Sequence, residues 1–217
     1  MRAHLRGRTG LTETMVEVGD ATYRMAHPVA ADALIDEEDF ARDERLPYWA
    51  ELWPSAVALA RYLSKEDLAG GRVIELGCGV GLPSLAALAR GARVTATDHY
   101  QVALDFVRYN ARTNLGGLEP QIHLLDWHAP RTEEFEEVFD LVLAADLLYE
   151  SRNVPALAVL IPTLLAPGGE VLLAEPRRKH APVFLEKMRD NDFRSSTEEH
   201  TVSSARLAVL VHRLRRG

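Results

Sequence analysis

The sequence predicts an α/β fold in which helices cover a doubly wound, mostly parallel sheet. Short β-branched runs alternate with amphipathic helical segments between residues 72 and 174, and a glycine-rich turn follows the first of these runs. Near the end of the chain, two strand-like stretches at 195–202 and 205–213 are separated only by Ser203-Ser204. So short a connection permits only a hairpin, and the final strand is therefore expected to run antiparallel.

Local patterns predict each element in order. The run at 72–76 is rich in β-branched residues and is stopped by glycines, as expected of a buried strand. Leu104, Val107 and Ala111 share one face of a helical segment. Further strands are expected at 93–97, 121–125, 141–145 and 170–174, and helices at 83–90, 101–114, 154–165 and 182–191.

Residues 1–54 are predicted to form an N-terminal extension that packs on a main domain at 55–217. Stretches 15–18 and 22–25 flank Gly19-Asp20, which indicates a β-hairpin. An acidic run at 32–44 either forms solvated surface or attracts the lysine-bearing surface of a partner. The aromatic segment PYWAELWP precedes a helix expected at 55–63, with Ser55 as its N-cap.

Composition excludes several classes of protein. The 217 residues include 25 lysines and arginines against 32 aspartates and glutamates, a net charge of −7, which argues against a nucleic-acid partner. No apolar run approaches the roughly 20 residues that span a bilayer, and no apolar segment follows the basic N-terminus as in a secretory signal. A single cysteine, Cys78, suits a reducing compartment, so a cytoplasmic protein is expected. The histidines show no metal-ligand spacing, and no metal site is predicted.

The glycine-rich turn is the first candidate for a binding site. Gly77, Gly79 and Gly81 follow a strand and open a helix, where free N–H groups favour an anionic ligand group. The spacing G-x-G-x-G differs from that of nicotinamide binders, and a Walker lysine is absent. Asp98 ends the next strand, 21 residues after Gly77, where an acid accepts hydrogen bonds from ribose hydroxyls. A purely structural turn and an ordinary strand-end aspartate are the alternatives.

The chain resembles class I S-adenosylmethionine-dependent methyltransferases in two stretches, ELGCGVGLPSLAALARGARVTATD and LLAPGGEVLLAEP. Three further stretches resemble methyltransferase family 16, namely PYWAELWPSAVALARYL, LLDW and DLVLAADLLYE. This family comprises non-histone protein lysine methyltransferases, including the one that acts on the electron-transfer flavoprotein β subunit. The resemblance implies a Rossmann-like, seven-stranded sheet and S-adenosylmethionine as cofactor, with S-adenosylhomocysteine as product.

The resemblance also implies how individual residues would hold this cofactor. Trp53 would close over it, and Ala145 would lie beside the departing methyl group. His99, next to Asp98, is either an edge of the adenine site or an incidental histidine. The remaining assignments are Glu75, Gly77, Gly79 and Gly81 for the methionine end, Asp98 for the ribose, and Asp126 and Trp127 for the adenine.

Asp146-x-x-Tyr149 is the candidate catalytic pair, because it follows the fourth strand at the edge where doubly wound sheets bind ligands. In a helical turn the two residues share a face, so that Asp146 accepts hydrogen bonds from an amine and Tyr149 contacts the cation. The alternatives are an N-cap and core packing. Since an alkylamine prefers hydrogen-bond acceptors, this pair indicates an aliphatic amine as the methyl acceptor, and the family resemblance implies lysine in a protein. A small-molecule amine as acceptor and a non-catalytic cofactor-binding module remain open, as does the oligomeric state.

Overall fold

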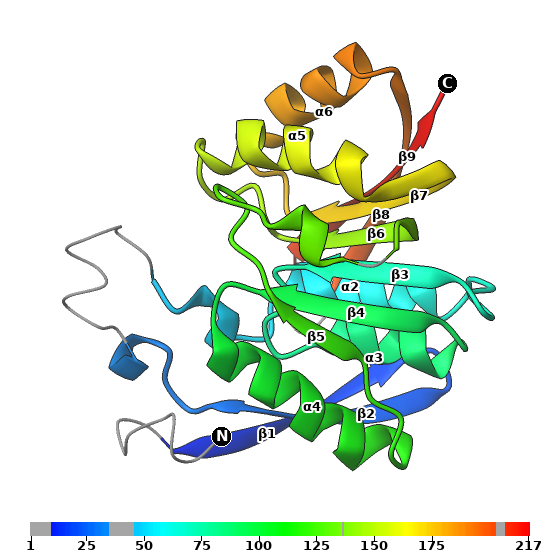
Figure 1. Ribbon diagram of the computed structural model, residues 1–217. Coiled ribbons are helices and arrows are strands. Elements are labelled where there is room, and N and C mark those ends of the chain that lie inside the picture. Colours follow the sequence, from blue (N-terminus) through cyan, green and yellow to red (C-terminus); the bar gives the residue numbers. More distant parts are fainter. Residues whose placement is uncertain (1–9, 35–45, 136, 203–206) are drawn as a thin grey trace.

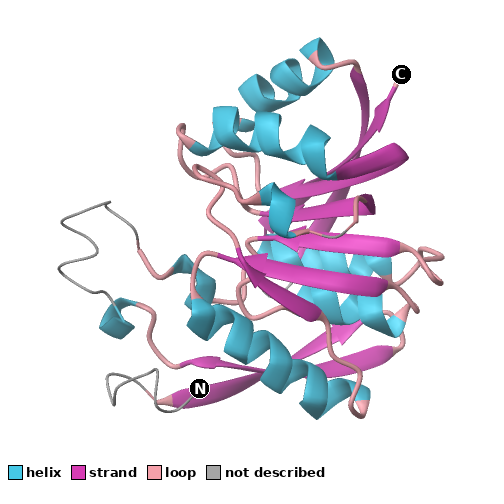
Figure 2. Ribbon diagram, in the orientation of Figure 1, coloured by secondary structure: helices cyan, strands magenta, loops and turns pink. Residues whose placement is uncertain are grey.

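The computed structural model describes residues 10–34, 46–135, 137–202 and 207–217. Its main sheet has seven strands in the order β5-β4-β3-β6-β7-β9-β8, and helices cover both faces (Figures 1 and 2). All neighbouring strands pair in parallel except at β9, which lies between β7 and β8 and is antiparallel to both. The predicted fold class, with its antiparallel final strand, is confirmed.

The elements follow the predicted alternation. The strands of the main sheet are β3 (Arg72–Leu76), β4 (Arg93–Asp98), β5 (Gln121–Leu124), β6 (Phe139–Ala145), β7 (Leu165–Glu175), β8 (Phe193–Val202) and β9 (Leu207–Arg216). The helices are α2 (Pro54–Leu63), α3 (Leu82–Ala89), α4 (Gln101–Leu115), α5 (Asn153–Leu164) and α6 (Ala181–Asp190), with 3-10 turns η1 (Asp32–Leu34), η2 (Tyr48–Ala50) and η3 (Thr132–Glu134).

Two local predictions differ from the structure. Helix α2 begins at Pro54 with Trp53 as its N-cap, because the fixed φ of proline suits the first helical position, and the Ser55 hydroxyl is buried without a hydrogen-bond partner among the described residues. Strand β7 begins directly after α5, so residues 166–169, which separate the predicted helix at 154–165 from the predicted strand at 170–174, lie inside the strand. Leu165 pairs with Phe139 of β6, and a register shift follows before Leu141.

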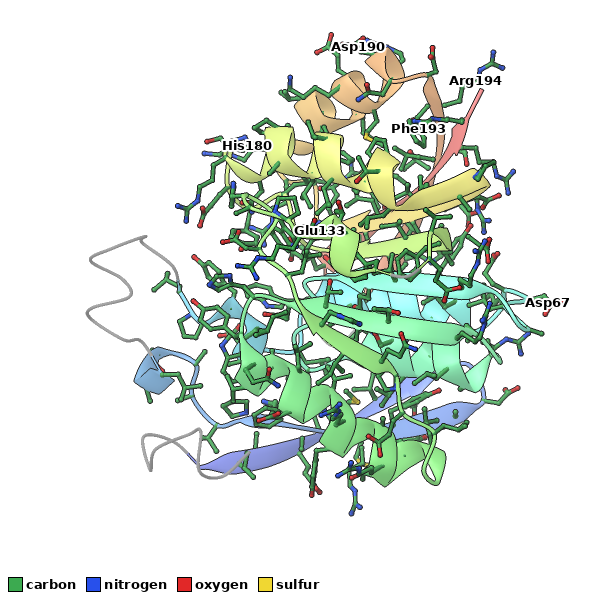
Figure 3. The ribbon with its side chains drawn as sticks, in the orientation of Figure 1. Asp67, Glu133, His180, Asp190, Phe193 and Arg194 are labelled. Atoms are coloured by element: carbon green, nitrogen blue, oxygen red, sulfur yellow. The ribbon has the colours of Figure 1, made fainter. Side chains whose placement is uncertain are left out.

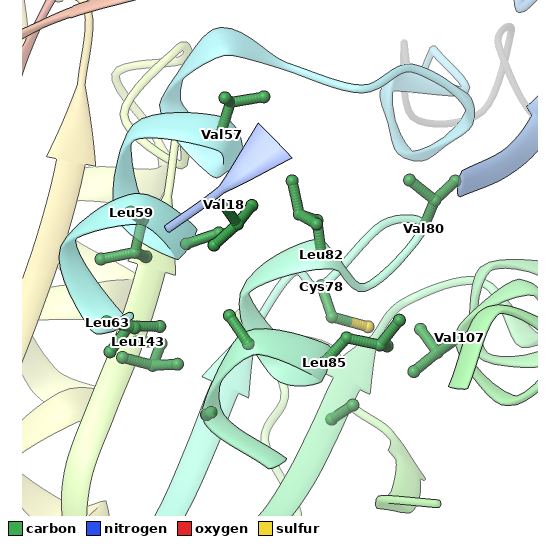
Figure 4. Packing of buried hydrophobic residues seen from close by; sticks show 14 of the residues in the cluster. Val18, Val57, Leu59, Leu63, Cys78, Val80, Leu82, Leu85, Val107 and Leu143 are labelled. Atoms are coloured by element: carbon green, nitrogen blue, oxygen red, sulfur yellow. The ribbon is translucent and has the colours of Figure 1, made fainter. Parts of the chain in front are cut away.

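The core has two parts, one on each face of the sheet. Alternate strand residues divide between them, since Val73 faces α2, α3 and α4, whereas Ile74 faces α5 and α6. Leu63 of α2 and Leu85 of α3 belong to the first part (Figure 4). Each fully buried aliphatic side chain contributes about 1.5–3 kcal/mol, so these two layers hold the strand ends in fixed relative positions.

The N-terminal hairpin consists of β1 (Leu11–Val18) and β2 (Ala21–Pro28), joined by the predicted turn at Gly19-Asp20. Two asparagines of α4 fix it to the main domain. The Asn110 side chain accepts a hydrogen bond from the Ala26 N–H (2.8 Å) and donates one to the Ala26 carbonyl (3.1 Å), and Asn114 makes the same pair with Arg24. The hairpin is therefore anchored through its backbone, while a domain boundary at residue 54 stays a prediction.

The ends of the parallel strands define the functional edge of the sheet. Figure 3 shows His180, which follows β7, on the side where these strands end, and Asp67, which precedes β3, on the opposite side. No helix among the described residues is long and apolar enough to cross a membrane. Most of the acidic run at 32–44 and the Ser203-Ser204 turn lie outside the described residues.

Candidate active site

A cavity of about 330 Å³ opens at the carboxyl ends of the parallel strands. This volume is at the lower end of the range for small-molecule sites, and the place is where doubly wound sheets bind ligands. The structure brings every predicted site residue to its wall. These residues are Trp53, Glu75, Gly77, Gly79, Gly81, Asp98, His99, Asp126, Trp127, Ala145, Asp146 and Tyr149.

The three glycines of the turn after β3 all have positive φ, at 59°, 51° and 89°. Their environment adds a second constraint. A Cβ on Gly77 would lie 2.8 Å from both Leu147 and Trp127, and one on Gly81 would lie 2.8 Å from Val107. The glycines are thus required by protein packing as well as by backbone conformation. The sequence pattern indicated a sharp turn and the close approach of a ligand, but not these contacts with distant side chains.

Glu75 lies near the end of β3 and is almost fully buried. Its carboxylate accepts hydrogen bonds from the Ser84 N–H (2.9 Å) and from the Ser84 hydroxyl, in the first turn of α3. Burial raises the pKa of Glu75 to about 8, although these bonds oppose the shift. Glu75 therefore caps α3 while it lines the cavity, a structural role that the sequence pattern did not indicate.

Asp98 links the end of β4 to the glycine turn. One carboxylate oxygen accepts a hydrogen bond from the Gly79 N–H and the other from the Tyr100 N–H, each at 3.0 Å. Burial raises the pKa of Asp98 to about 6 despite these bonds. Since each carboxylate oxygen has two lone pairs, Asp98 retains acceptor capacity toward a ligand in the cavity.

Trp127 and Asp126 form the wall beyond β5. Asp126 accepts a hydrogen bond from the His128 N–H (3.0 Å), and one of its oxygens lies 3.8 Å from Nδ1 of His99. The Trp127 indole N–H is buried and has no hydrogen-bond partner among the described residues. A buried donor without an acceptor is rare in native structures, so this wall suits a ligand that carries an acceptor.

An aromatic wall faces the cavity from the segment before α2. Trp53 donates its indole N–H to the Tyr48 carbonyl (2.8 Å), and the Tyr48 ring packs edge-to-face on Trp53 and on Tyr149, with centroids 6.0 and 5.0 Å apart. Tyr48 was not predicted individually, although the aromatic segment PYWAELWP was its signal. Trp49 instead packs inward against Tyr100 and Phe106.

Asp146 follows β6 directly, and its N–H donates to the Ala174 carbonyl of β7 (2.8 Å). The expected helical turn at 146–149 is absent, because α5 begins only at Asn153, and Asp146 is not an N-cap. Its carboxylate instead forms a bidentate pair with Arg178, at 2.7 and 3.1 Å. Burial raises the pKa of Tyr149 to about 12, so its hydroxyl stays protonated.

Arg178 is the main residue that sequence reasoning did not place correctly. The position of Arg177 and Arg178 after the fifth predicted strand of the sheet indicates either the rim of the substrate mouth or solvated charge, and neither interpretation includes a contact with Asp146. Because β6 and β7 are parallel neighbours, residues past their ends meet, and this adjacency was the available signal. Among the described residues, no group of three or more histidine, cysteine, aspartate or glutamate side chains is arranged to hold a metal ion.

Comparison with known proteins settles the family. A family model described as lysine methyltransferase matches residues 40–191, which is more than half of the chain. The chain belongs to this family. The resemblance drawn from the sequence is thereby confirmed, and the matched range includes all the predicted site residues.

Two curated members of the family show how far the likeness extends. The chain is 37% identical over 136 residues to protein N-lysine methyltransferase METTL21A of Danio rerio, covering 60% of this chain and 62% of that protein. It is 34% identical over 137 residues to the electron transfer flavoprotein beta subunit lysine methyltransferase of Xenopus laevis, covering 61% and 53%. The match thus spans between half and two thirds of the length of these two relatives.

Solved structures of lower identity share the fold. The N-methyltransferase NodS of Bradyrhizobium japonicum WM9, in complex with S-adenosylhomocysteine, superposes with a TM-score of 0.62 at 19% identity. The superposition covers 83% of this chain and 95% of NodS. The class I methyltransferase architecture is therefore shared beyond the lysine methyltransferase family.

Proposed function

We propose that this protein transfers a methyl group from S-adenosylmethionine to lysine side chains of a protein. The observation that carries the proposal is the meeting of two sets of residues in one cavity, one suited to the cofactor and one suited to an amine. Membership of the lysine methyltransferase family supports the same conclusion. Because the match covers only part of the relatives, the residues of the site must also favour this acceptor.

The cavity fits the cofactor at three places. Asp98 retains lone pairs for two ribose hydroxyls, and the unpartnered Trp127 N–H suits an acceptor such as an adenine nitrogen. The buried Glu75 carboxylate would be balanced by the ammonium group of the methionine end. When bound, S-adenosylmethionine supplies an electrophilic methyl group on a positively charged sulfur, and the protein supplies alignment and exclusion of water.

The acceptor side has what an alkylamine needs. A free lysine amine has a pKa near 10.4, so it must lose a proton before it acts as a nucleophile. The Asp146 carboxylate offers acceptors that orient the amine, while Tyr48 and Tyr149 present ring surfaces that exclude water and contact a cation. The two relatives are both named as lysine methyltransferases, which supports a protein lysine as acceptor.

A cytoplasmic location follows as a further part of this proposal. The only cysteine, Cys78, is buried in the glycine turn, where burial raises the pKa of its thiol well above the usual value. Because the sequence contains no second cysteine, Cys78 forms no intramolecular disulfide, which suits a protein that works in a reducing compartment.

The proposal is tested by incubating the purified protein with S-adenosylmethionine labelled in its methyl group and a cell lysate. We expect labelled protein bands that disappear when lysine amines are chemically blocked beforehand and that fade, at sub-saturating cofactor, when Asp98→Ala replaces the wild type. Hydrolysis of the bands should yield labelled methyl-lysine. Label in small molecules only would support the small-amine alternative, and cofactor binding without any labelled product would support a non-catalytic module.

A further inference from the structure

The acid that faces the acceptor already has a cationic partner. Arg178 binds both oxygens of Asp146, and the pair lies inside the cavity wall, with the Asp146 side chain only 4% exposed and that of Arg178 33% exposed. A bidentate arginine uses one lone pair of each carboxylate oxygen and leaves the other. Asp146 therefore stays a hydrogen-bond acceptor, but its negative charge is balanced.

A hydrogen-bonded network holds the backbone of this arginine in place. The backbone N–H of Arg178 donates to Glu175, whose other carboxylate oxygen lies 3.1 Å from Nε2 of His212. Glu175 and His212 are buried, and Nδ1 of His212 lies 2.8 Å from the Thr197 hydroxyl. The contacts run from β8 through β9 and β7, and they fix the backbone at the residue whose side chain binds Asp146.

The backbone is also specialised at this point. Only three described residues other than glycine have positive φ, and two of them are Asp146 (60°), a member of the ion pair, and Arg177 (56°), the residue before its partner Arg178. A positive φ is unfavourable for an arginine and persists only where its surroundings enforce it. The conformations at 146 and 177 thus fit a site that is built to bring these two side chains together.

Other charged and titratable groups around the pair come from every neighbouring element. The hydrogen bond to Asp146 is the main factor that raises the pKa of Arg178, and Glu175 and Tyr48 add to it, so the guanidinium remains cationic. Glu150 and Arg152 form an ion pair with each other. The remaining such groups that line the cavity are Glu51, Glu75, Cys78, Asp98, His99, Tyr100, Asp126, His128 and Tyr149.

We propose that Arg178 is a positioning residue that makes the pocket select a neutral lysine amine over its ammonium form. It does so by fixing Asp146 as an acceptor while cancelling its charge. An unbalanced carboxylate would stabilise the ammonium, raise the pKa of the bound lysine and hold the acceptor in its unreactive form. The inference rests on the proposed function, since it concerns the amine side of the same cavity.

The first test needs no turnover. Binding of n-butylamine, a lysine side chain without its backbone, is followed by NMR on protein saturated with S-adenosylhomocysteine between pH 7 and 10. For the wild type the apparent affinity should rise about tenfold per pH unit, in step with the neutral fraction of the amine. For Arg178→Gln the affinity should be flat or fall with pH, because the exposed charge of Asp146 then favours the ammonium.

Two further variants control this experiment. Arg177→Gln removes the adjacent arginine, which pairs with Glu199 instead, and should keep the wild-type pH dependence. The double variant Asp146→Asn with Arg178→Gln leaves no uncompensated charge in the wall and should restore the rise of affinity with pH. The proposal is overturned if the wild type prefers the ammonium, or if Arg178→Gln follows the same pH dependence as the wild type.

Turnover provides an independent readout. In the methylation assay, Arg178→Gln should displace the acid limb of the pH–rate profile by about one unit to higher pH, so that the rate at pH 7.5 falls about tenfold. An equal loss at every pH would show a merely structural role and contradict the proposal. If the wild type methylates no lysine, the proposed function fails, whereas the n-butylamine measurement still decides the role of Arg178.

Discussion

The cofactor end and the acceptor end of the cavity use acidic residues in opposite ways. Glu75 and Asp98, on β3 and β4, are buried among backbone and hydroxyl donors, and burial raises the pKa of each. Asp146, after β6, is paired with Arg178. The two sets lie at the same edge of one sheet, so the partner of each carboxylate, rather than its position in the fold, determines its role.

The difference also explains what each end can bind. Carboxylates that lack a cationic partner are electrostatically unsatisfied and suit a ligand that brings hydroxyl groups or an ammonium. A carboxylate whose charge is balanced by an arginine can still orient a ligand through hydrogen bonds. Because the pair adds no net charge, it suits a neutral nucleophile. Variants that alter one end should therefore affect cofactor affinity and turnover separately.

The largest effect is expected for Asp146→Ala. The variant removes the acceptor that orients the amine and frees Arg178, so turnover should fall by about a hundredfold, the scale of a misplaced reacting group. Affinity for S-adenosylmethionine, measured by calorimetry, should change by less than about twofold, since the interaction that is removed acts on the methyl acceptor and not on the cofactor. Equal losses in both quantities would show that the two ends are not separable.

Asp98→Ala should show the converse behaviour. Loss of hydrogen bonds to the ligand and of the link to Gly79 should weaken cofactor binding by about 1–3 kcal/mol. At saturating cofactor the turnover should remain close to that of the wild type. An unchanged calorimetric affinity would remove Asp98 from the cofactor site.

Gly79→Ala tests the backbone at the cofactor end. The added Cβ would meet the Trp49 carbonyl at 3.1 Å in a conformation with φ of 51°, so unfolding in urea should show a loss of about 1–2 kcal/mol. Arg177→Gly, at the acceptor end, should instead leave stability equal or slightly higher, because it relieves an unfavourable φ. If both substitutions lowered the free energy of unfolding, or both raised it, this contrast between the two ends would be contradicted.

The smallest effect concerns pH. Because burial raises the pKa of Glu75 from 4.5 to about 8, the folded protein without cofactor keeps a proton that the unfolded chain releases. The stabilisation from this group is complete below about pH 4.5 and is lost as pH rises toward 8. Glu75→Gln can still accept the Ser84 bonds but cannot ionise. The melting temperature of this variant minus that of the wild type should therefore increase from pH 4.5 to pH 8. A difference that stays constant with pH would contradict the raised pKa of Glu75.

Most of the fold could be predicted because it depends on local patterns. The β-branched runs, the glycine turn and the Gly19-Asp20 hairpin act through neighbouring residues, and the parallel pairing of the strands follows from their alternation with helices, whereas the strand order is known only from the structure. The start of α2 was misjudged because Pro54 outweighed Ser55. The early start of β7 depends on pairing with β6, which the sequence of either segment alone does not contain.

The site residues could be predicted as a set but not as a network. Spacing after each strand places Asp98 and Asp146 at the same edge, which the structure shows. The partners of these residues are side-chain contacts between segments distant in sequence, such as Asp146 with Arg178 and Glu75 with Ser84. No pattern in a single sequence indicates which of several nearby charges will pair, and therefore the balanced charge at the acceptor end emerged only from the structure.

The most direct measurement is a crystal structure of the protein with S-adenosylhomocysteine. We expect the ligand in the cavity, with its ribose hydroxyls on Asp98, its adenine beside Trp127 and its sulfur facing the paired Asp146. A ligand bound elsewhere on the protein, or a cavity closed by side chains at saturating ligand, would contradict it.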